Sequence, residues 1–180
     1  FAGYVYYFSY YFYELFTGLK WLTLLKESAS YVSMYGSFYP HSMFAFMLMP
    51  GWLRMRMWKK FINPWVNHEY LKAVCDGAYD PRWDPMKLND ALSLTLFSTA
   101  IPEMLRWEDK NSMRWSIETR PPFLDVALVE SVLPLPSGMK LKNGTRKMIF
   151  KEAMKGVIPS MIGKRNDRIG FAAPIDEFFR

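Results

Sequence analysis

The chain of 180 residues is long enough for one domain with a hydrophobic core and too short for two independent ones. Of its residues, 51% are hydrophobic and 18% are aromatic, which excludes a disordered polar chain. The net charge is +6, the single cysteine (Cys75) excludes an intrachain disulfide, and the two histidines show no zinc-binding spacing, so we expect a cytoplasmic, reducing environment and no metal site.

Two helices are predicted at the start of the chain. Apolar residues recur at helical spacing between residues 4 and 19, and Gly18 marks the end of the first helix. From Phe1 to Leu19 the only charge is Glu14, and a run of this length and composition could cross a bilayer. Its tyrosines favour an interface over hydrocarbon, so we predict a buried amphipathic helix and no membrane contact, with a membrane helix as the alternative. A second helix is predicted from Trp21 into the thirties.

The middle of the chain is interrupted by turn-forming residues. Between residues 35 and 51, glycines and prolines enclose a methionine-rich run, which predicts a short helix or a packed loop. We interpret these methionines as core filling rather than a metal site, because no soft-metal partner accompanies them. Residues 63–85 carry Asp-Pro and Asp-Gly pairs, which predict an irregular surface connection.

Three further helices are predicted from capping residues. The first begins at Asn89 or Asp90 and reaches Pro102, which ends it or opens the next helix; the second begins at Asp125 and the third at Thr145. The first should be well buried, because apolar residues surround much of its circumference: Leu92, Leu94, Leu96, Phe97 and Ile101. On the second, the residues expected to face inward are Val126, Leu128, Val129, Val132 and Leu133. No stretch alternates with a period of two, so the sequence predicts a mostly α-helical chain.

Positive charge gathers between residues 138 and 170. Nine lysines and arginines in this segment are accompanied by only two acidic residues, Glu152 and Asp167. Such a field suits a polyanion: nucleic acid, an acidic membrane surface or the triphosphate of a nucleotide. No glycine-rich phosphate-binding motif occurs in these 180 residues.

Four motifs point to a family. They lie at residues 106–113, 116–125, 142–147 and 165–171. In this order and at these separations they resemble the C-terminal half of the glutamine-hydrolysing asparagine synthetase (asparagine synthase) family, and residues 1–4 resemble a segment that follows an acidic pair in that family. The segment 118–125 is the most specific of these matches.

The resemblance implies a fold and a reaction. We expect the mainly α C-terminal half of an α/β ATP-pyrophosphatase domain, with residues 1–180 forming part of one synthetase domain. The glutaminase domain and the pyrophosphate-binding loop are not in these residues. The family uses ATP with Mg²⁺ to adenylate the aspartate side chain, and ammonia from the glutaminase domain of the same chain then displaces AMP. We therefore expect these residues alone to be inactive; a homodimer is left open.

The resemblance also implies site residues. Arg168 matches a basic position that faces the phosphates, where the family usually has lysine; arginine keeps the charge but does not donate its proton. Further candidates for ATP or substrate contact are Arg165, Lys147, Asp109 and Gly170. Lys147 is expected on the first turn of its helix, where a cation opposes the helix dipole. For the basic residues the alternative is an exposed solubilising charge, and for Asp109 it is a cap or a salt bridge.

Three residues of the most specific motif are predicted to be structural. We expect Asp125 to cap a helix and Arg120 to pair with Glu118 or another carboxylate.

Other functions fit part of the pattern. The same fold serves β-lactam synthetases, peptide cyclases and cell-surface sugar amidotransferases, whose synthetase halves resemble this one. A non-catalytic helical domain with a basic face is the alternative from another class. We expect no nucleic-acid partner, because the aromatic residues lie at core spacing rather than among the lysines and arginines.

Overall fold

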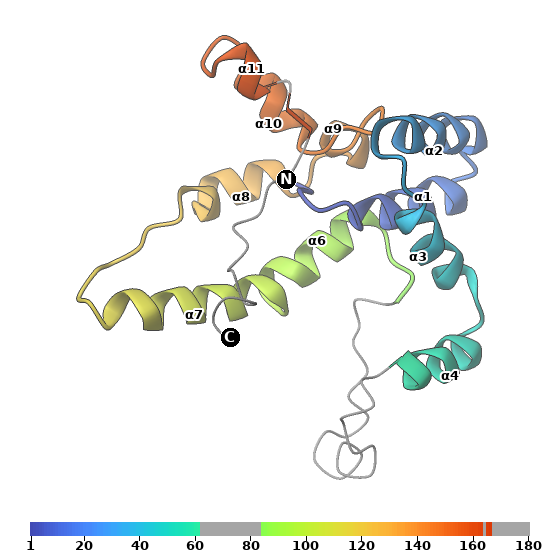
Figure 1. Ribbon diagram of the computed structural model, residues 1–180, viewed down its shortest axis with the longest axis horizontal. Helices are drawn as coiled ribbons and strands as arrows, with labels where there is room; N and C mark the ends of the chain where they lie inside the picture. Colours follow the sequence, from blue (N-terminus) through green and yellow to red (C-terminus); the bar gives the residue numbers. More distant parts are fainter. Residues whose placement is uncertain (62–83, 164, 167–180) are drawn as a thin grey trace, which may run out of the picture.

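A computed structural model describes residues 1–61, 84–163 and 165–166 (Figure 1). In this part of the chain all regular elements are helical, as the sequence predicts. The elements are α1 (Tyr7–Thr17), α2 (Trp21–Tyr35), α3 (Tyr39–Leu48), α4 (Gly51–Phe61), α6 (Leu88–Phe97), α7 (Ala100–Met113), the 3₁₀ turn η2 (Pro122–Leu124), α8 (Val126–Val132), α9 (Ser137–Lys140), α10 (Met148–Ala153) and α11 (Ser160–Gly163).

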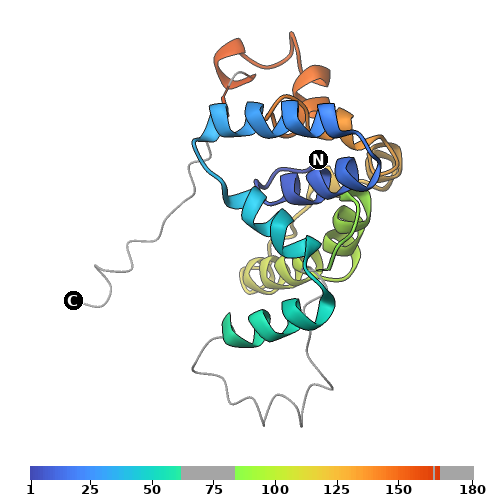
Figure 2. The same cartoon turned by 90° about the vertical axis from the view of Figure 1, so that its right-hand side faces the viewer.

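Helix α1 is the centre of the core. It contacts α2, α3 and α6, and Figures 1 and 2 both show it between α2 and α3. Its side chains are buried from Tyr7 through Phe12 and again at Leu15. Gly18 ends the helix and its amide donates to the Glu14 carbonyl oxygen. The predicted buried first helix is therefore confirmed.

No helix in residues 1–61, 84–163 and 165–166 combines the length and the hydropathy that a membrane span requires.

The methionine-rich run forms the short helix α3. Met43 and Met47 are buried in the core, as predicted. The ring of Phe44 on α3 lies 6.3 Å from that of Phe12 on α1, so aromatic contacts join the two helices. The predicted connection at 63–85 lies almost wholly outside the described residues.

Helix α6 begins differently from the prediction. Its N-cap residue is Lys87, not Asn89 or Asp90, and the Lys87 side chain makes no capping hydrogen bond. The Leu88 amide instead donates to Glu14 Oε2 on α1 at 3.2 Å. A carboxylate from a helix that is distant in sequence thus replaces the local cap, which sequence periodicity does not reveal.

Two residues predicted to be buried are exposed. Phe97 is 68% exposed and Val126 is 69% exposed, whereas Leu92 is buried as predicted. The first two lie at the last position of α6 and the first position of α8, where no neighbouring described helix covers the chain. Helical spacing identifies an apolar stripe, but the neighbouring elements decide how much of it is covered.

Helix α7 follows α6 and extends away from α1 (Figure 1). Pro102 lies in its first turn, so this proline opens the next helix, one of the two predicted alternatives. None of its side chains is buried. Residues 114–121 then lead to η2 and α8.

Candidate functional site

A tight turn at residues 142–145 leads into the site. Lys142 and Thr145 exchange both backbone hydrogen bonds, at 3.2 and 2.8 Å. The central Asn143 and Gly144 have φ of +50° and +70°, the left-handed values that an Asn-Gly pair adopts in two-residue turns. A Cβ on Gly144 would lie 2.9 Å from the Ser30 carbonyl oxygen. The turn therefore sits directly against α2.

This turn corrects the prediction that Thr145 caps a helix. Helix α10 begins at Met148, and its N-cap residue is Lys147, with φ of +53° and no capping hydrogen bond from its side chain. Lys147 therefore precedes the first turn instead of lying on it. The left-handed conformation of a non-glycine residue costs about 1–2 kcal/mol. A cation at a helix start is also unfavourable, so local helix energetics do not explain a lysine here.

Arg146 connects three segments that are distant in sequence. Its Nε donates to the Tyr35 hydroxyl at 3.2 Å, and its Nη1 donates to the Gly3 carbonyl oxygen at 3.2 Å. Its Nη2 donates to the Asn166 carbonyl oxygen at 2.6 Å. The guanidinium carbon also lies 5.3 Å from the centre of the Tyr35 ring, a cation–π distance. The side chain thus fixes α2, the N-terminal segment and residue 166 relative to one another.

Lys151 on α10 also donates hydrogen bonds to residues 165 and 166. Its Nζ donates to the Arg165 carbonyl oxygen at 2.9 Å and to Asn166 Oδ1 at 2.6 Å. Burial lowers the pKa of Lys151, and the charge of Arg146 lowers it further. Both effects disfavour the charged ammonium, so an anion placed nearby would stabilise it.

These residues surround a hollow that we call the cationic pocket. It has a volume of about 310 Å³ and is lined by Gly3, Tyr4, Arg146, Lys147, Lys151, Arg165 and Asn166. Four of these seven residues are cations, and no aspartate or glutamate is among those the structure describes around it. Arg146 and Lys151 donate to neutral oxygen atoms, so these hydrogen bonds do not cancel their charges. The arrangement suits an anionic group such as a phosphate.

Three aromatic rings join segments that are distant in sequence. Phe1, Phe123 and Phe150 lie edge-to-face with one another at centroid distances of 5.5–5.7 Å. They come from the N-terminal segment, η2 and α10, so the cluster joins the most specific motif to the segment that carries Lys147.

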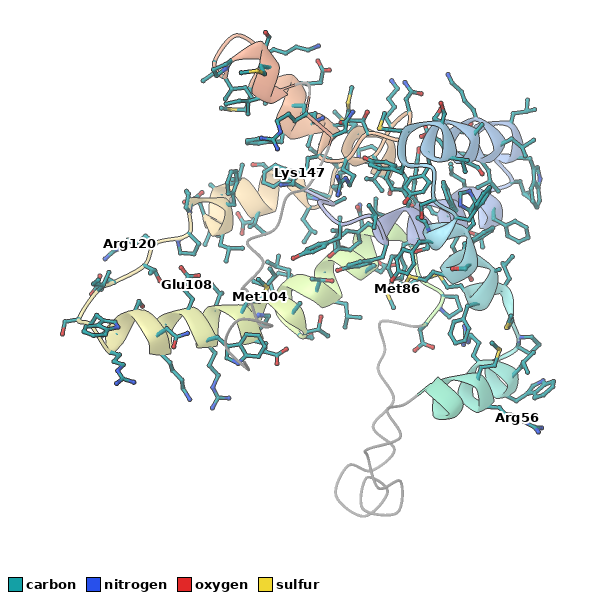
Figure 3. The ribbon with its side chains drawn as sticks, in the orientation of Figure 1. Arg56, Met86, Met104, Glu108, Arg120 and Lys147 are labelled. Atoms are coloured by element: carbon teal, nitrogen blue, oxygen red, sulfur yellow. The ribbon has the colours of Figure 1, made fainter. Side chains whose placement is uncertain are left out.

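The structure places only some of the predicted site residues together. Lys147 and Arg165 both line the cationic pocket. Arg168 and Gly170 lie outside the described residues. Asp109 is exposed on α7 and is not among the pocket residues. Figure 3 shows the adjacent Glu108 well apart from Lys147, on a different arm of the molecule.

The motif at 116–125 has the predicted structural contacts. Arg120 donates to Glu118 at 2.9 Å, in an exposed pair that contributes little to stability. Asp125 Oδ1 accepts the Leu128 amide at 3.0 Å and caps α8.

A buried polar cluster was not predicted. The ammonium of Lys140 is fully buried and donates to Asn89 Oδ1 and to the carbonyl oxygens of Leu133 and Leu135, at 2.5–2.8 Å. Burial lowers the pKa of Lys140 to about 8, and the Glu14 carboxylate opposes this shift. Glu14 also accepts from Ser137 Oγ at 2.7 Å. A lone carboxylate in an apolar run was the available sequence signal for such a cluster.

A second hollow, of about 230 Å³, is mainly apolar. Residues of the N-terminal segment, α6, η2 and α8 line it, and Lys140 has the only charged side chain among the described residues around it. In the described part of the chain no group of three or more His, Cys, Asp or Glu side chains is arranged to hold a metal ion.

Comparisons with a family model and with individual proteins both match asparagine synthetases. The family model described as asparagine synthase matches residues 1–180. Glutamine-hydrolyzing asparagine synthetase 3 of Bacillus subtilis (strain 168) is 39% identical over 108 residues, which are 58% of this chain and 18% of the relative. Asparagine synthetase 1 of the same organism is 33% identical over 78 residues, 43% of this chain and 12% of the relative. A putative asparagine synthetase of Mycobacterium bovis is 31% identical over 98 residues, 54% of this chain and 15% of the relative. The matched part is thus less than a fifth of each relative, and no solved structure gives a significant match.

Proposed function

Because the chain belongs to the asparagine synthase family, we propose that it forms part of an ATP-dependent synthetase that converts a side-chain carboxylate to an amide with glutamine as nitrogen source. We assign residues 1–180 to the C-terminal part of one synthetase domain of the ATP-pyrophosphatase type. Aspartate is the proposed acceptor, because the relatives are named asparagine synthetases.

The cationic pocket carries this proposal. In the proposed reaction a carboxylate oxygen of aspartate attacks the α-phosphorus of ATP, and the bond to the β-phosphate oxygen breaks. Pyrophosphate leaves with the electron pair of that bond, so negative charge grows on the leaving group. Positioned cations in a site that excludes water stabilise such charge by several kcal/mol. Ammonia then attacks the activated carbonyl carbon, AMP leaves, and a proton is lost from nitrogen.

We assign pyrophosphate contact to Lys147 and Arg165. Both line the cationic pocket, so a phosphate group placed there would lie close to both charges. Arg168 follows Arg165 by three positions, and we propose that it adds a further charge to the same group. Its guanidinium supplies two parallel donors but no transferable proton, so its proposed role is electrostatic.

Mg²⁺ is not assigned to any described residue. No carboxylate cluster in them fits a magnesium ion, whose ligands are oxygen atoms. The matched part covers 12–18% of the relatives' length. We propose that the pyrophosphate-binding loop, the glutaminase domain and most of the magnesium ligands belong to parts of a longer polypeptide that residues 1–180 do not match.

The test uses the full-length polypeptide that contains residues 1–180. Supplied with aspartate, glutamine, ATP and Mg²⁺, it should release asparagine, AMP, pyrophosphate and glutamate in equal amounts, measured by chromatography. Formation of ADP and phosphate, or of no amide with any acceptor, would contradict the proposal. Release of AMP and pyrophosphate only with a different carboxylate would move the protein to another synthetase of this fold.

A further inference from the structure

The three donor nitrogens of Arg146 each serve a different segment. Tyr35 is 111 residues away in sequence, Gly3 is 143 away and Asn166 is 20 away. The last of these hydrogen bonds, at 2.6 Å, is the shortest of the three. Its acceptor is a neutral carbonyl, so the bond orients the chain without cancelling the charge of Arg146.

Two cationic side chains, Arg146 and Lys151, hold residues 165–166. Lys151 donates hydrogen bonds to the Arg165 carbonyl oxygen and to the Asn166 side-chain oxygen. Arg146 donates to the Asn166 carbonyl oxygen. Both consecutive carbonyl groups and the intervening side chain are therefore engaged by cations. We call this arrangement the clamp.

The hydrogen bonds of the clamp oppose electrostatic repulsion among the cationic side chains of the pocket. Arg146, Lys147, Lys151 and Arg165 share one hollow, and the lowered pKa of Lys151 reflects both its burial and the neighbouring charge. Without an anion, mutual repulsion among Arg146, Lys147 and Lys151 favours a wider pocket. The hydrogen bonds to residues 165 and 166 preorganise the pocket. They reduce the free energy that anion binding must supply to order the pocket.

We propose that Arg146 is a positioning residue: together with Lys151 it holds Arg165 and Asn166 against the N-terminal segment, so that the cationic pocket has its binding shape before the anionic group arrives. This inference rests on the proposed function for the identity of the anion. The clamp itself is a property of the chain and is tested separately.

Arginine is required for this role rather than positive charge alone. Its planar fork directs separate nitrogens at separate acceptors, whereas lysine has one nitrogen. Arg146→Lys keeps the charge of the pocket and the number of trypsin cleavage sites. It removes the simultaneous hydrogen bonds to Tyr35, Gly3 and Asn166. Arg114→Lys is the matched control, because Arg114 is exposed at the end of α7 and does not line the pocket.

The first experiment is limited trypsin digestion of the full-length polypeptide, followed by mass spectrometry. Arg146→Lys should accelerate cleavage between Arg165 and Asn166 about tenfold, the effect of losing one charge-assisted hydrogen bond. Arg114→Lys should not change that rate. Equal rates in the wild type and Arg146→Lys would overturn the clamp.

The second experiment measures protection of the same bond by inorganic pyrophosphate. The Arg146→Lys variant should need about tenfold more pyrophosphate for half-maximal protection, because a smaller fraction of molecules holds the binding shape. In Arg146→Ala, millimolar guanidinium should restore protection. A melting temperature below that of the Arg114→Lys control with unchanged pyrophosphate protection would make Arg146 a purely structural residue and overturn the proposal.

Failure of the two proposals can be told apart. In one outcome the wild type makes no amide, but Arg146→Lys accelerates trypsin cleavage after Arg165 and weakens its protection by pyrophosphate. This outcome would support the clamp and contradict the proposed reaction. If the wild type makes asparagine and Arg146→Lys has the wild-type KM for ATP and the wild-type cleavage rate, the clamp falls and the reaction stands. The clamp predicts that Arg146→Lys raises KM for ATP more than it lowers kcat.

Discussion

Lys140 shows how a single residue couples stability to pH. Its pKa of about 8 in the folded chain lies below the ordinary lysine value of 10.5. Between these values the unfolded chain binds more protons than the folded chain, so the free energy of unfolding contributed by Lys140 rises as pH rises. Below about pH 8 both states are charged, and the cost of burying the charge is fully present.

The variant Lys140→Met tests this coupling between stability and pH. It should be destabilised by about 2–4 kcal/mol, because Asn89 Oδ1 and two carbonyl oxygens lose a buried donor. Its deficit relative to the wild type should be larger at about pH 9.5 than at about pH 7, measured by thermal unfolding. The exposed Lys142→Met is the control. A deficit that does not change with pH would refute the pH coupling.

Arg168 gives a functional test at the same scale. In the full-length polypeptide, Arg168→Ala should lower amide synthesis about 100-fold or more, because the proposed function gives Arg168 a charge that stabilises the leaving pyrophosphate. Glutamine hydrolysis should be unchanged, because the proposed function assigns it to another domain. An unchanged rate of amide formation would remove Arg168 from the site.

Single residues were predictable from the sequence where their contacts are local. Asp125 caps the helix that follows it, and Arg120 pairs with a carboxylate two residues away. The positions of Arg146 and Lys140 depend on partners up to 143 residues distant, so no local pattern reports them. Their recognition requires the packed structure.

At the scale of elements, the turn at 142–145 determines where the basic segment lies. Gly144→Ala should destabilise the protein by about 2–4 kcal/mol, because it adds a strained backbone conformation and a contact 2.9 Å from the Ser30 carbonyl oxygen. Gly156→Ala is the matched control: its φ is +80°, but a Cβ there would meet nothing within 4 Å. It should cost only about 1 kcal/mol. Equal losses in chemical denaturation would show that the turn is not seated on α2.

Helices were predicted more reliably than their ends. Apolar periodicity gives α1 and α2 correctly, and α3 confirms the short helix that was one of two alternatives for the methionine-rich run. The start of α10 was missed because Thr145, a good capping residue, belongs instead to the Asn-Gly turn. The Asn-Gly pair was itself the missed signal, since it favours a two-residue turn over a helix start.

At the scale of the whole molecule, apolar surface remains uncovered. Helix α7 has no buried side chain, and Met104, Trp107, Met113 and Trp115 on and after it are all exposed. Figure 3 shows α7 as a separate arm, with Met104 and Glu108 directed toward the side on which α8 lies. An exposed surface of this kind is typical of an interface.

We therefore expect residues 1–180, produced alone, to bind a hydrophobic dye such as ANS and to associate, and the full-length polypeptide to bind much less dye per molecule. The comparison is made by fluorescence titration and light scattering. A clean monomer of residues 1–180 that unfolds cooperatively without binding dye would contradict this expectation.

The pyrophosphate affinity of the cationic pocket tests the central claim most directly. Calorimetric titration of inorganic pyrophosphate into the full-length polypeptide should show binding that weakens at least about 100-fold in the Lys147→Gln/Arg165→Gln double variant, because two charge contacts are lost. The exposed Lys142→Gln, which lies outside the pocket lining, should bind as the wild type does. Equal affinity in the wild type and the double variant would contradict the assignment of these cations to the leaving group.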